Sequence, residues 1–250
     1  MTREESFFHN HLGQESPGGI PGKEGAVKRG FTLLEMVVVL VVLSLLFIVL
    51  TPSLTKHVQE VRRTQAVNDE RALGAALLSL YKDTGYWPST NADGPSGGVN
   101  RLLSGESGVE ASQRFSSSSP GAFRWGSSLP AKSLGDFLFF NNPDDDSGIN
   151  SSAQSGQDYP SSGENSWRGP YIDRPYWRDP WGGVYVVNAR YFPGNPLSDK
   201  TARAGHRLMV LSAGPDGVWQ TPFDDNTRKT TLPDDSPGGD DVAFVFYTND

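Results

Sequence analysis

The stretch that decides the fold runs from Phe31 to Leu50 and reads FTLLEMVVVLVVLSLLFIVL. A helix of this length, at a rise of about 1.5 Å per residue, is about 30 Å long and matches the hydrocarbon core of a bilayer. A cleaved secretory signal would have a shorter apolar core and a small-residue cleavage site, whereas Thr51-Pro52-Ser53-Leu54 follows here. We therefore predict a retained transmembrane helix over 31–50.

One carboxylate, Glu35, interrupts this apolar stretch near its beginning. A charge in that position costs on the order of 2–3 kcal/mol unless it is paired or reaches the interface. One interpretation is an end residue that reaches the interface and has no further role. The other is that a second chain supplies a positive partner. Cleavage just before Phe31 would create such a partner, because the new α-amine is cationic.

The net charge of −7 comes from 22 basic and 29 acidic side chains and is concentrated in one segment. Met1 to Gly30 is balanced, whereas Leu211 to Asp250 holds eight aspartates against two basic residues, a local balance of −6. This balance excludes a generally basic nucleic-acid-binding protein. The absence of cysteine excludes a disulfide framework, a cysteine-ligated metal site and thiol catalysis.

A helical pattern continues beyond the apolar stretch. Leu54, Val58 and Val61 recur at helical spacing. Farther along, a second set has the spacing of a core-facing helical stripe: Leu73, Ala76, Leu77, Leu80 and Tyr81. Pro52 is expected to loosen this helix locally, and Gly85 to end it. The result is one helix of roughly 50 residues, whose second half is amphipathic.

Three short segments rich in β-branched and aromatic residues follow near the end of the chain. They are Val184–Val187, Arg207–Ser212 and Val242–Tyr247, separated by Gly, Pro, Asn and Asp turns. We predict that they form a small antiparallel sheet packed on the amphipathic part of the helix. The expected fold class is α+β.

The residues around the start of the apolar stretch resemble a known processing site. Lys28-Arg29-Gly30, then Phe31-Thr32-Leu33-Leu34-Glu35 and the apolar run, is similar to the prepilin site of type IV pilins and type II secretion pseudopilins. The resemblance implies cleavage after Gly30 and methylation of Phe31 by prepilin peptidase. It also implies a cytoplasmic leader, one pass through the bacterial inner membrane and a periplasmic head. Basic residues flank the apolar stretch on both sides, so charge alone does not decide the topology.

Later stretches resemble the major pseudopilin, the G protein of type II secretion. They are Tyr81 to Pro88, Gly169 to Ile172, Asp179 to Tyr185 and Leu211 to Gly217, and the resemblance covers 28–88 and 168–250. The expected organisation is a leader (1–30), a transmembrane helix (31–50), an amphipathic helix (51–88), a variable insertion (89–168) and a pilin-like sheet with an Asp-rich loop (169–250).

The segment 89–168 is unlike that family and holds 19 Ser and 11 Gly, a composition typical of a flexible loop. Its aromatic residues include Phe123, Trp125 and the run Phe137-Leu138-Phe139-Phe140. We expect these to pack locally against the sheet, with a partner-binding surface as the alternative.

Seven aspartates lie between the last two expected strands: Asp216, Asp224, Asp225, Asp234, Asp235, Asp240 and Asp241. Calcium takes six to eight oxygen ligands, so this loop suits a Ca²⁺ site. The residues alone equally allow a solvated acidic loop whose aspartates serve turns. The resemblance favours calcium, because the G pseudopilin binds it in this loop. By position, it implies the main-chain oxygen of Leu211 together with Asp216, Asp240 and Asp241, while Asp224 and Asp225 lie in an extension that the family mostly lacks.

We expect no enzymatic activity, because the sequence contains neither a P-loop nor a dinucleotide fingerprint. The resemblance implies a structural subunit that polymerises with itself and other pseudopilins on an inner-membrane assembly platform, for protein export. The alternatives are a type IV pilus or DNA-uptake pilin, in which a nucleic-acid partner is expected, and a singly anchored calcium-binding or enzymatic domain.

Overall fold

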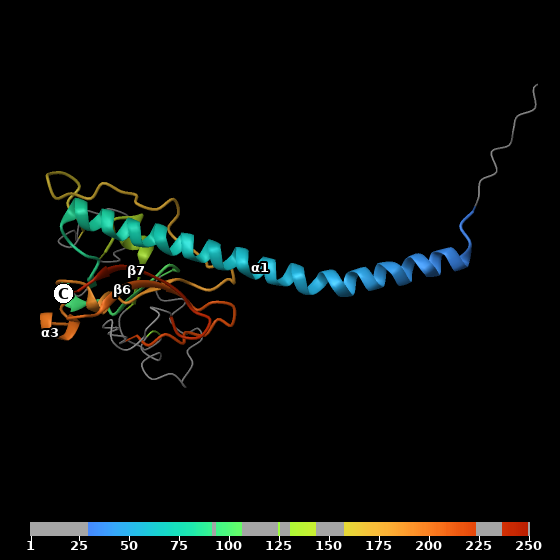
Figure 1. Cartoon of the computed structure of the whole chain (residues 1–250). Coiled ribbons are helices and arrows are strands. Elements are labelled where there is room, and N and C mark those ends of the chain that lie inside the picture. Colours follow the sequence, from blue (N-terminus) through green and yellow to red (C-terminus); the bar gives the residue numbers. More distant parts are fainter. Residues whose placement is uncertain are drawn as a thin grey trace, which may run out of the picture. The chain divides into compact units, whose positions relative to one another are not determined.

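The computed structural model describes most of the chain beyond the leader (Figure 1). The described residues are 30–91, 94–106, 125, 131–143, 158–223 and 237–249. The chain divides into two compact units, Met1–Thr51 and Pro52–Asp250. Residues 1–29 of the expected leader, Phe123 and four of the aspartates (224, 225, 234 and 235) lie outside the described residues.

The elements follow one another in a simple order. They are α1 (Leu33–Thr84), β1 (Thr90–Asn91), β2 (Gly94–Gly98), β3 (Arg101–Leu103), β4 (Ala131–Ser133), α2 (Leu134–Leu138), β5 (Val186–Val187), a 3-10 helix (Ala189–Tyr191), α3 (Lys200–Arg203), β6 (Arg207–Ser212) and β7 (Val242–Thr248).

In the first unit, α1 carries large apolar side chains that are 44–83% exposed from Leu33 to Ile48. In this stretch, side chains are described as far as Ile48. Among the described residues, no helix is both long and apolar enough to cross a membrane. The span expected over 31–50 stays a prediction.

In the second unit, one face of α1 forms part of the core. Leu73, Ala76, Leu77 and Leu80 are buried, as the helical spacing predicts, whereas Tyr81 is 41% exposed and stacks on Trp87 with ring centroids 4.5 Å apart. The helix ends before Gly85, whose positive φ of 76° is a conformation that favours glycine. The Gly85 amide donates to the carbonyl of Tyr81 at 2.8 Å, which closes the last turn as the sequence predicts.

The main sheet has five strands in the order β4-β3-β5-β6-β7, and α1 lies along it (Figure 1). The α+β class is confirmed, and β6 has the predicted bounds, while β5 is shorter than expected. The sheet is mixed rather than antiparallel, because β4 runs parallel to β3. A parallel pair needs a crossover connection of a dozen residues or more, and the long segment 104–130 between the two strands provides that length.

The Ser- and Gly-rich segment 89–168 supplies ordered parts of this head, which its composition did not predict. Strands β3 and β4 and helix α2 lie within it, and the first turn of α2 has a capping box made by Ser133 and Asp136. Trp125 is fully buried and donates from its indole nitrogen to the carbonyl of Thr221 at 2.6 Å. Phe137 and Leu138 are also fully buried, so local packing is confirmed for these three residues.

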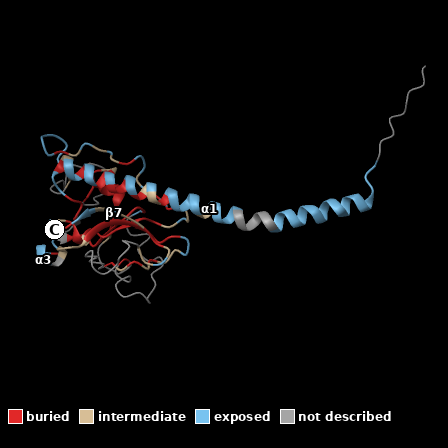
Figure 2. Ribbon diagram, viewed as in Figure 1, coloured by how far each residue is buried: buried red, intermediate tan, exposed pale blue. Residues whose placement is uncertain are grey.

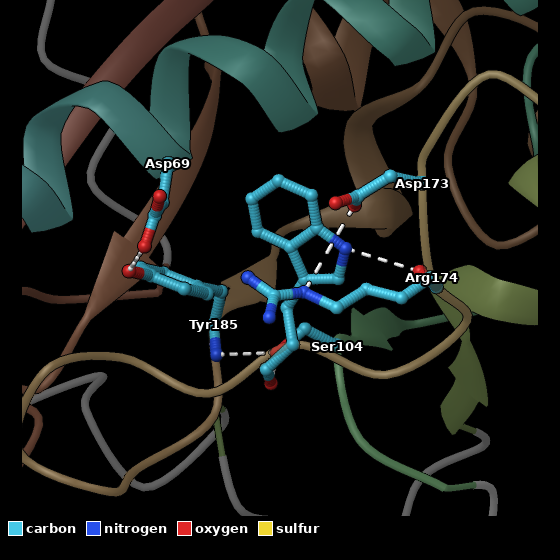
Figure 3. A network of polar contacts seen from close by, with 6 residues as sticks. Asp69, Ser104, Asp173, Arg174 and Tyr185 are labelled. Atoms are coloured by element: carbon cyan, nitrogen blue, oxygen red, sulfur yellow. Dashed lines mark hydrogen bonds and ion pairs between the residues drawn. The ribbon is translucent and has the colours of Figure 1, made fainter. Parts of the chain in front are cut away.

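A hydrogen-bonded network joins α1 to the sheet and to the loop before β5 (Figure 3). The Tyr185 hydroxyl donates to a carboxylate oxygen of Asp69 on α1 at 2.8 Å. The Tyr185 amide donates to the hydroxyl of Ser104 at 2.8 Å, and that hydroxyl donates to the carbonyl of Trp177 at 2.7 Å. These contacts fix the position of the helix relative to β3 and β5.

A second polar connection is fully buried and centres on Glu70 of α1. Its Oε1 accepts the Ser212 amide of β6 at 3.2 Å, while Oε2 is buried and accepts no hydrogen bond among the described residues. The Ser212 hydroxyl donates to Asp179 Oδ2 at 2.6 Å, and Asp179 Oδ1 accepts the amides of Gly183 (2.6 Å) and Trp181 (3.0 Å). Helix, strand and turn therefore meet at Ser212, whose amide and hydroxyl donate to Glu70 and Asp179 respectively.

Burial dominates the electrostatics of Glu70 and raises the pKa of its carboxyl from 4.5 to about 9. The Ser212 hydrogen bond and Arg63 lower this pKa, whereas Asp179 and Asp69 raise it further. Between about pH 4.5 and pH 9, folded chains therefore hold a proton on Glu70 that unfolded chains have already released. The free energy of unfolding is expected to fall as the pH rises through that window.

Gly74 lies where α1 and β7 approach each other closely. A Cβ at this position would lie 3.1 Å from Cβ of Phe246 and 3.2 Å from the ring of Phe244. We expect Gly74→Val to lower the free energy of unfolding by about 1–3 kcal/mol, because the added methyl groups overpack this contact. Ala75→Val, at an exposed position one residue along, is the matched control, and urea unfolding measures both. Equal effects of the two changes would contradict the close approach.

Replacing Glu70 with Gln removes the titrating group and leaves the side-chain shape nearly unchanged. We expect the variant to exceed the natural chain in free energy of unfolding by an amount on the order of 1–3 kcal/mol at pH 8, and to show no such excess at pH 4. Urea unfolding at several pH values measures the difference. Glu60→Gln, at an exposed position of the same helix, is the control. A difference for Glu70→Gln that does not change with pH would refute the effect of burial.

Candidate functional site

The predicted processing and assembly residues lie at the beginning of α1. Gly30 and Phe31 precede the helix, and the side chains of Phe31 and Glu35 are exposed, Phe31 by 72%. The Thr32 hydroxyl accepts the Glu35 amide at 3.1 Å, so Thr32 caps the first turn. A carboxylate in the first turn also interacts favourably with the positive end of the helix dipole. The spacing of Thr32 and Glu35 is that of a capping box, a signal that our sequence analysis missed.

The acidic site in the head is built on the turn that follows β6. Gly214 and Gly217 both have positive φ, 65° and 67°, and Asp216 lies between them. A Cβ on Gly214 would collide with the carbonyl of Asp240, so a residue with a side chain does not fit there. The Asp216 amide donates to Asp240 Oδ2 at 3.2 Å. The structure therefore brings together Asp216 and Asp240, which lie far apart in the sequence.

Gln220 connects the carboxylates and was not anticipated from the sequence. Its Nε2 donates to Asp216 Oδ2 at 2.8 Å, and its Oε1 accepts the Asp240 amide at 2.9 Å. The amides of Gln220 and Thr221 donate to Asp241 Oδ2 at 2.9 and 2.7 Å. A glutamine between two acidic turns carries no sequence signal of its own. Its role follows from the approach of 238–241 to 214–221.

Asp241 is fully buried, and its environment balances two opposing effects. Burial raises the pKa of its carboxyl to about 6, although hydrogen bonds from Thr221 and Gln220 lower it. Oδ1 of Asp241 and Oδ1 of Asp240 are both buried and accept no hydrogen bond among the described residues. Two carboxylate oxygens are thus available to a further partner, and oxygen is the ligand atom that calcium prefers.

The remaining predicted ligands are placed less completely. Leu211 lies in β6 opposite Ala243 of β7, and Ser212 lies opposite Val242. The residue opposite Leu211 is therefore only two positions after Asp241. Asp224 and Asp225 lie outside the described residues. Within the parts of the chain that the structure describes, no group of three or more acidic or histidine side chains is arranged to hold a metal ion. The described oxygens fit a calcium site in part and require donors from elsewhere to complete it.

Comparison with known proteins agrees with these features. The family described as "Prokaryotic N-terminal methylation motif" matches residues 26–51. Type II secretion system core protein G of Pectobacterium carotovorum subsp. carotovorum is 41% identical over 69 residues, which are 28% of this chain and 44% of that protein. The core protein G of Escherichia coli (strain K12) is 40% identical over 64 residues, 26% of this chain and 44% of the relative.

A pilus protein is similar as well. Fimbrial protein EcpC of Eikenella corrodens is 30% identical over 66 residues, 26% of this chain and 43% of the relative. The chain thus spans less than half the length of each of these relatives. No solved structure was found to match it. The motif around Gly30 and Phe31 and these similarities agree: over about a quarter of its length, the chain is similar to type II secretion core protein G and to a fimbrial protein.

Proposed function

We propose that this chain is a pseudopilin subunit that prepilin peptidase cleaves after Gly30 and that then polymerises into a type II secretion pseudopilus for protein export. The observation that carries the proposal is the methylation motif over 26–51. The similarity to core protein G of type II secretion supports the secretion system in particular. The partners would be further copies of the chain, other pseudopilins, the peptidase and an inner-membrane assembly platform.

In this proposal the N-terminal segment anchors the chain in the inner membrane, with the head in the periplasm. The exposed apolar side chains of 33–48 need an apolar environment, which lipid supplies before assembly and neighbouring helices supply afterwards. Glu35 would pair with the Phe31 α-amine of a neighbouring subunit. Because burying an ion pair costs desolvation energy, the pair would set the register of neighbours rather than add stability.

Calcium would act within the head as a resident ion. Asp240 and Asp241 would hold it through the two carboxylate oxygens that lack hydrogen bonds, with Asp216, Asp224, Asp225 and the Leu211 carbonyl as the other candidates. Bound calcium neutralises carboxylate charge and bridges the chain segments that supply its ligands. This chain has no cysteine, so such a bridge would take the place of a disulfide in stabilising the head.

A type IV pilus or DNA-uptake pilin is the second candidate, and the similarity to fimbrial protein EcpC favours it. The two proposals share cleavage, methylation and polymerisation, and they differ in the assembly platform and in what the filament moves. Deletion of the genes of either system in the source bacterium would distinguish them through loss of exported protein or loss of surface pili.

The first test is the N-terminus of the protein in the membrane. We expect intact-mass measurement to give the mass of residues 31–250 plus one methyl group. Glu35→Ala is expected to be cleaved normally but to remain in the detergent-soluble fraction, whereas the natural chain and the control Glu60→Ala sediment as filaments. An uncleaved N-terminus would contradict the proposal and favour a plain membrane anchor. Normal filaments from Glu35→Ala would remove the pairing role alone.

Calcium binding is tested by thermal unfolding of the full chain in detergent with calcium or with a chelator. We expect calcium to raise the unfolding temperature; a ligand at a hundred times its Kd contributes about 2.7 kcal/mol. The calcium-dependent increase should shrink in Asp240→Asn and in Asp241→Asn. Asp173→Asn, whose side chain is 74% exposed and lies outside the acidic site, is the control. No increase in the natural chain would identify the segment as a solvated acidic loop.

A further inference from the structure

A groove with a volume of about 430 Å³ lies between α1 and two turns of the head. The helix lines it with Lys56, Gln59, Glu60 and Arg63, and the turns line it with Trp181 and Pro215. All six residues belong to the second unit. The helix is exposed at this end of the unit, whereas farther along one of its faces is buried against the sheet (Figure 2). A groove of this volume is large enough for part of a small molecule.

The indole of Trp181 forms one wall of the groove. Its Nε1 donates to Gln59 Oε1 at 3.0 Å, which ties the turn to the helix and satisfies the polar edge of the ring. Pro215 and the aliphatic stems of Lys56 and Arg63 add apolar surface. Tryptophan, with an apolar body and one polar edge, is typical of the boundary between lipid and water. The walls therefore suit hydrocarbon next to a polar group.

The charges that line the groove are not balanced. Lys56 and Arg63 are positive and Glu60 is negative, so the sum is +1. None of the three forms an ion pair within 4.0 Å with another described residue. Arg63 lies near enough to Glu70 to lower the pKa of that carboxyl, but burial still raises this pKa to about 9. Glu70 therefore stays protonated at neutral pH and does not neutralise Arg63.

This sum selects among anions. A ligand with one negative charge, such as a phosphodiester, balances it. A phosphate monoester with two negative charges is opposed by the Glu60 carboxylate. A free phosphate group also lacks a part that would cover Trp181 and Pro215. Charge and apolar surface together indicate a phosphodiester attached to hydrocarbon.

The position of the groove along the chain indicates where such a ligand would come from. Lys56 follows the span expected over 31–50 by six residues, about 9 Å of helix. The polar layer on each side of a bilayer is about 5–8 Å thick. Helical side chains point back toward the N-terminus, and a lysine stem is long, so the Lys56 ammonium would reach this layer.

We propose that the groove binds a phospholipid with one net negative charge. Lys56 contacts its phosphodiester, Arg63 attracts it, and the glycerol and upper acyl region lie against Trp181 and Pro215. The inference rests on the membrane anchoring in the proposed function, to which it adds a lipid partner for the head. A lipid bound in this way would hold the head at the membrane surface until the subunit leaves the bilayer.

Native mass spectrometry of the full chain tests the proposal. The chain is released from detergent micelles that contain equal amounts of phosphatidylglycerol and phosphatidylcholine with the same acyl chains. We expect one phosphatidylglycerol to be retained, with an occupancy at least fivefold above that of phosphatidylcholine. Lys56→Gln combined with Arg63→Gln should reduce it to the phosphatidylcholine level, because the phosphodiester then has no positive partner in the groove.

The matched control removes two exposed cations from the same helix outside the groove. Arg71→Gln combined with Lys82→Gln is expected to retain phosphatidylglycerol at the natural level. Equal retention of the two lipids by the natural chain, or an equal loss in the control, would overturn the proposal. Glycerol 3-phosphate, which has the phosphate but no acyl chains, should not displace the lipid at tenfold excess. Displacement would assign the site to a free phosphate group and overturn the lipid.

Photo-cross-linking locates the bound lipid. The full chain is placed in bilayers that contain a phosphatidylglycerol with a diazirine on its acyl chain close to the glycerol. We expect labelled peptides that include Trp181, besides those from the apolar stretch 31–50. Trp181→Leu should lower the retention of phosphatidylglycerol at least threefold while the unfolding temperature shows a folded head. Labels confined to 31–50 would overturn the groove as the site.

The same samples separate this inference from the proposed function. An uncleaved N-terminus with selective retention of phosphatidylglycerol would contradict the proposed processing and support the lipid site. A cleaved chain that forms filaments but shows no preference for phosphatidylglycerol would overturn the lipid site alone. A natural chain recovered outside the membrane fraction would overturn both.

Discussion

The burial of one face of α1 against the sheet is the constraint on which the head depends. Three of the five strands of the main sheet are short, β5 having two residues and β3 and β4 three each, and such strands need packing against another element to be stable. Leu73, Leu77 and Leu80 supply fully buried apolar surface from the helix, and glycine at position 74 allows β7 to approach. The helix therefore serves as one layer of the core, and a chain lacking it would lose the sheet as well.

Polar contacts set the position of this layer. Tyr185 ties α1 to β5 through Asp69, and Glu70 ties it to β6 through the Ser212 amide. Burial keeps the Glu70 carboxyl group protonated across the neutral range, and only one of its two oxygens has a hydrogen-bond partner among the described residues. Such a group contributes little to stability. Its value is geometric: a helix displaced by one turn along the sheet would lose both contacts at once. In a head without cysteine, such contacts help to fix the layers where a disulfide is not available.

The sequence predicted the parts governed by local rules. The helix end at Gly85, the buried stripe of Leu73 to Leu80 and the strand Arg207–Ser212 follow from glycine conformation, helical period and β-branched composition. Two features did not follow. The parallel β3–β4 pair depends on a long-range connection, and Gln220 is oriented by segments that are distant in the chain. Each is determined by tertiary contact, which composition and spacing do not encode.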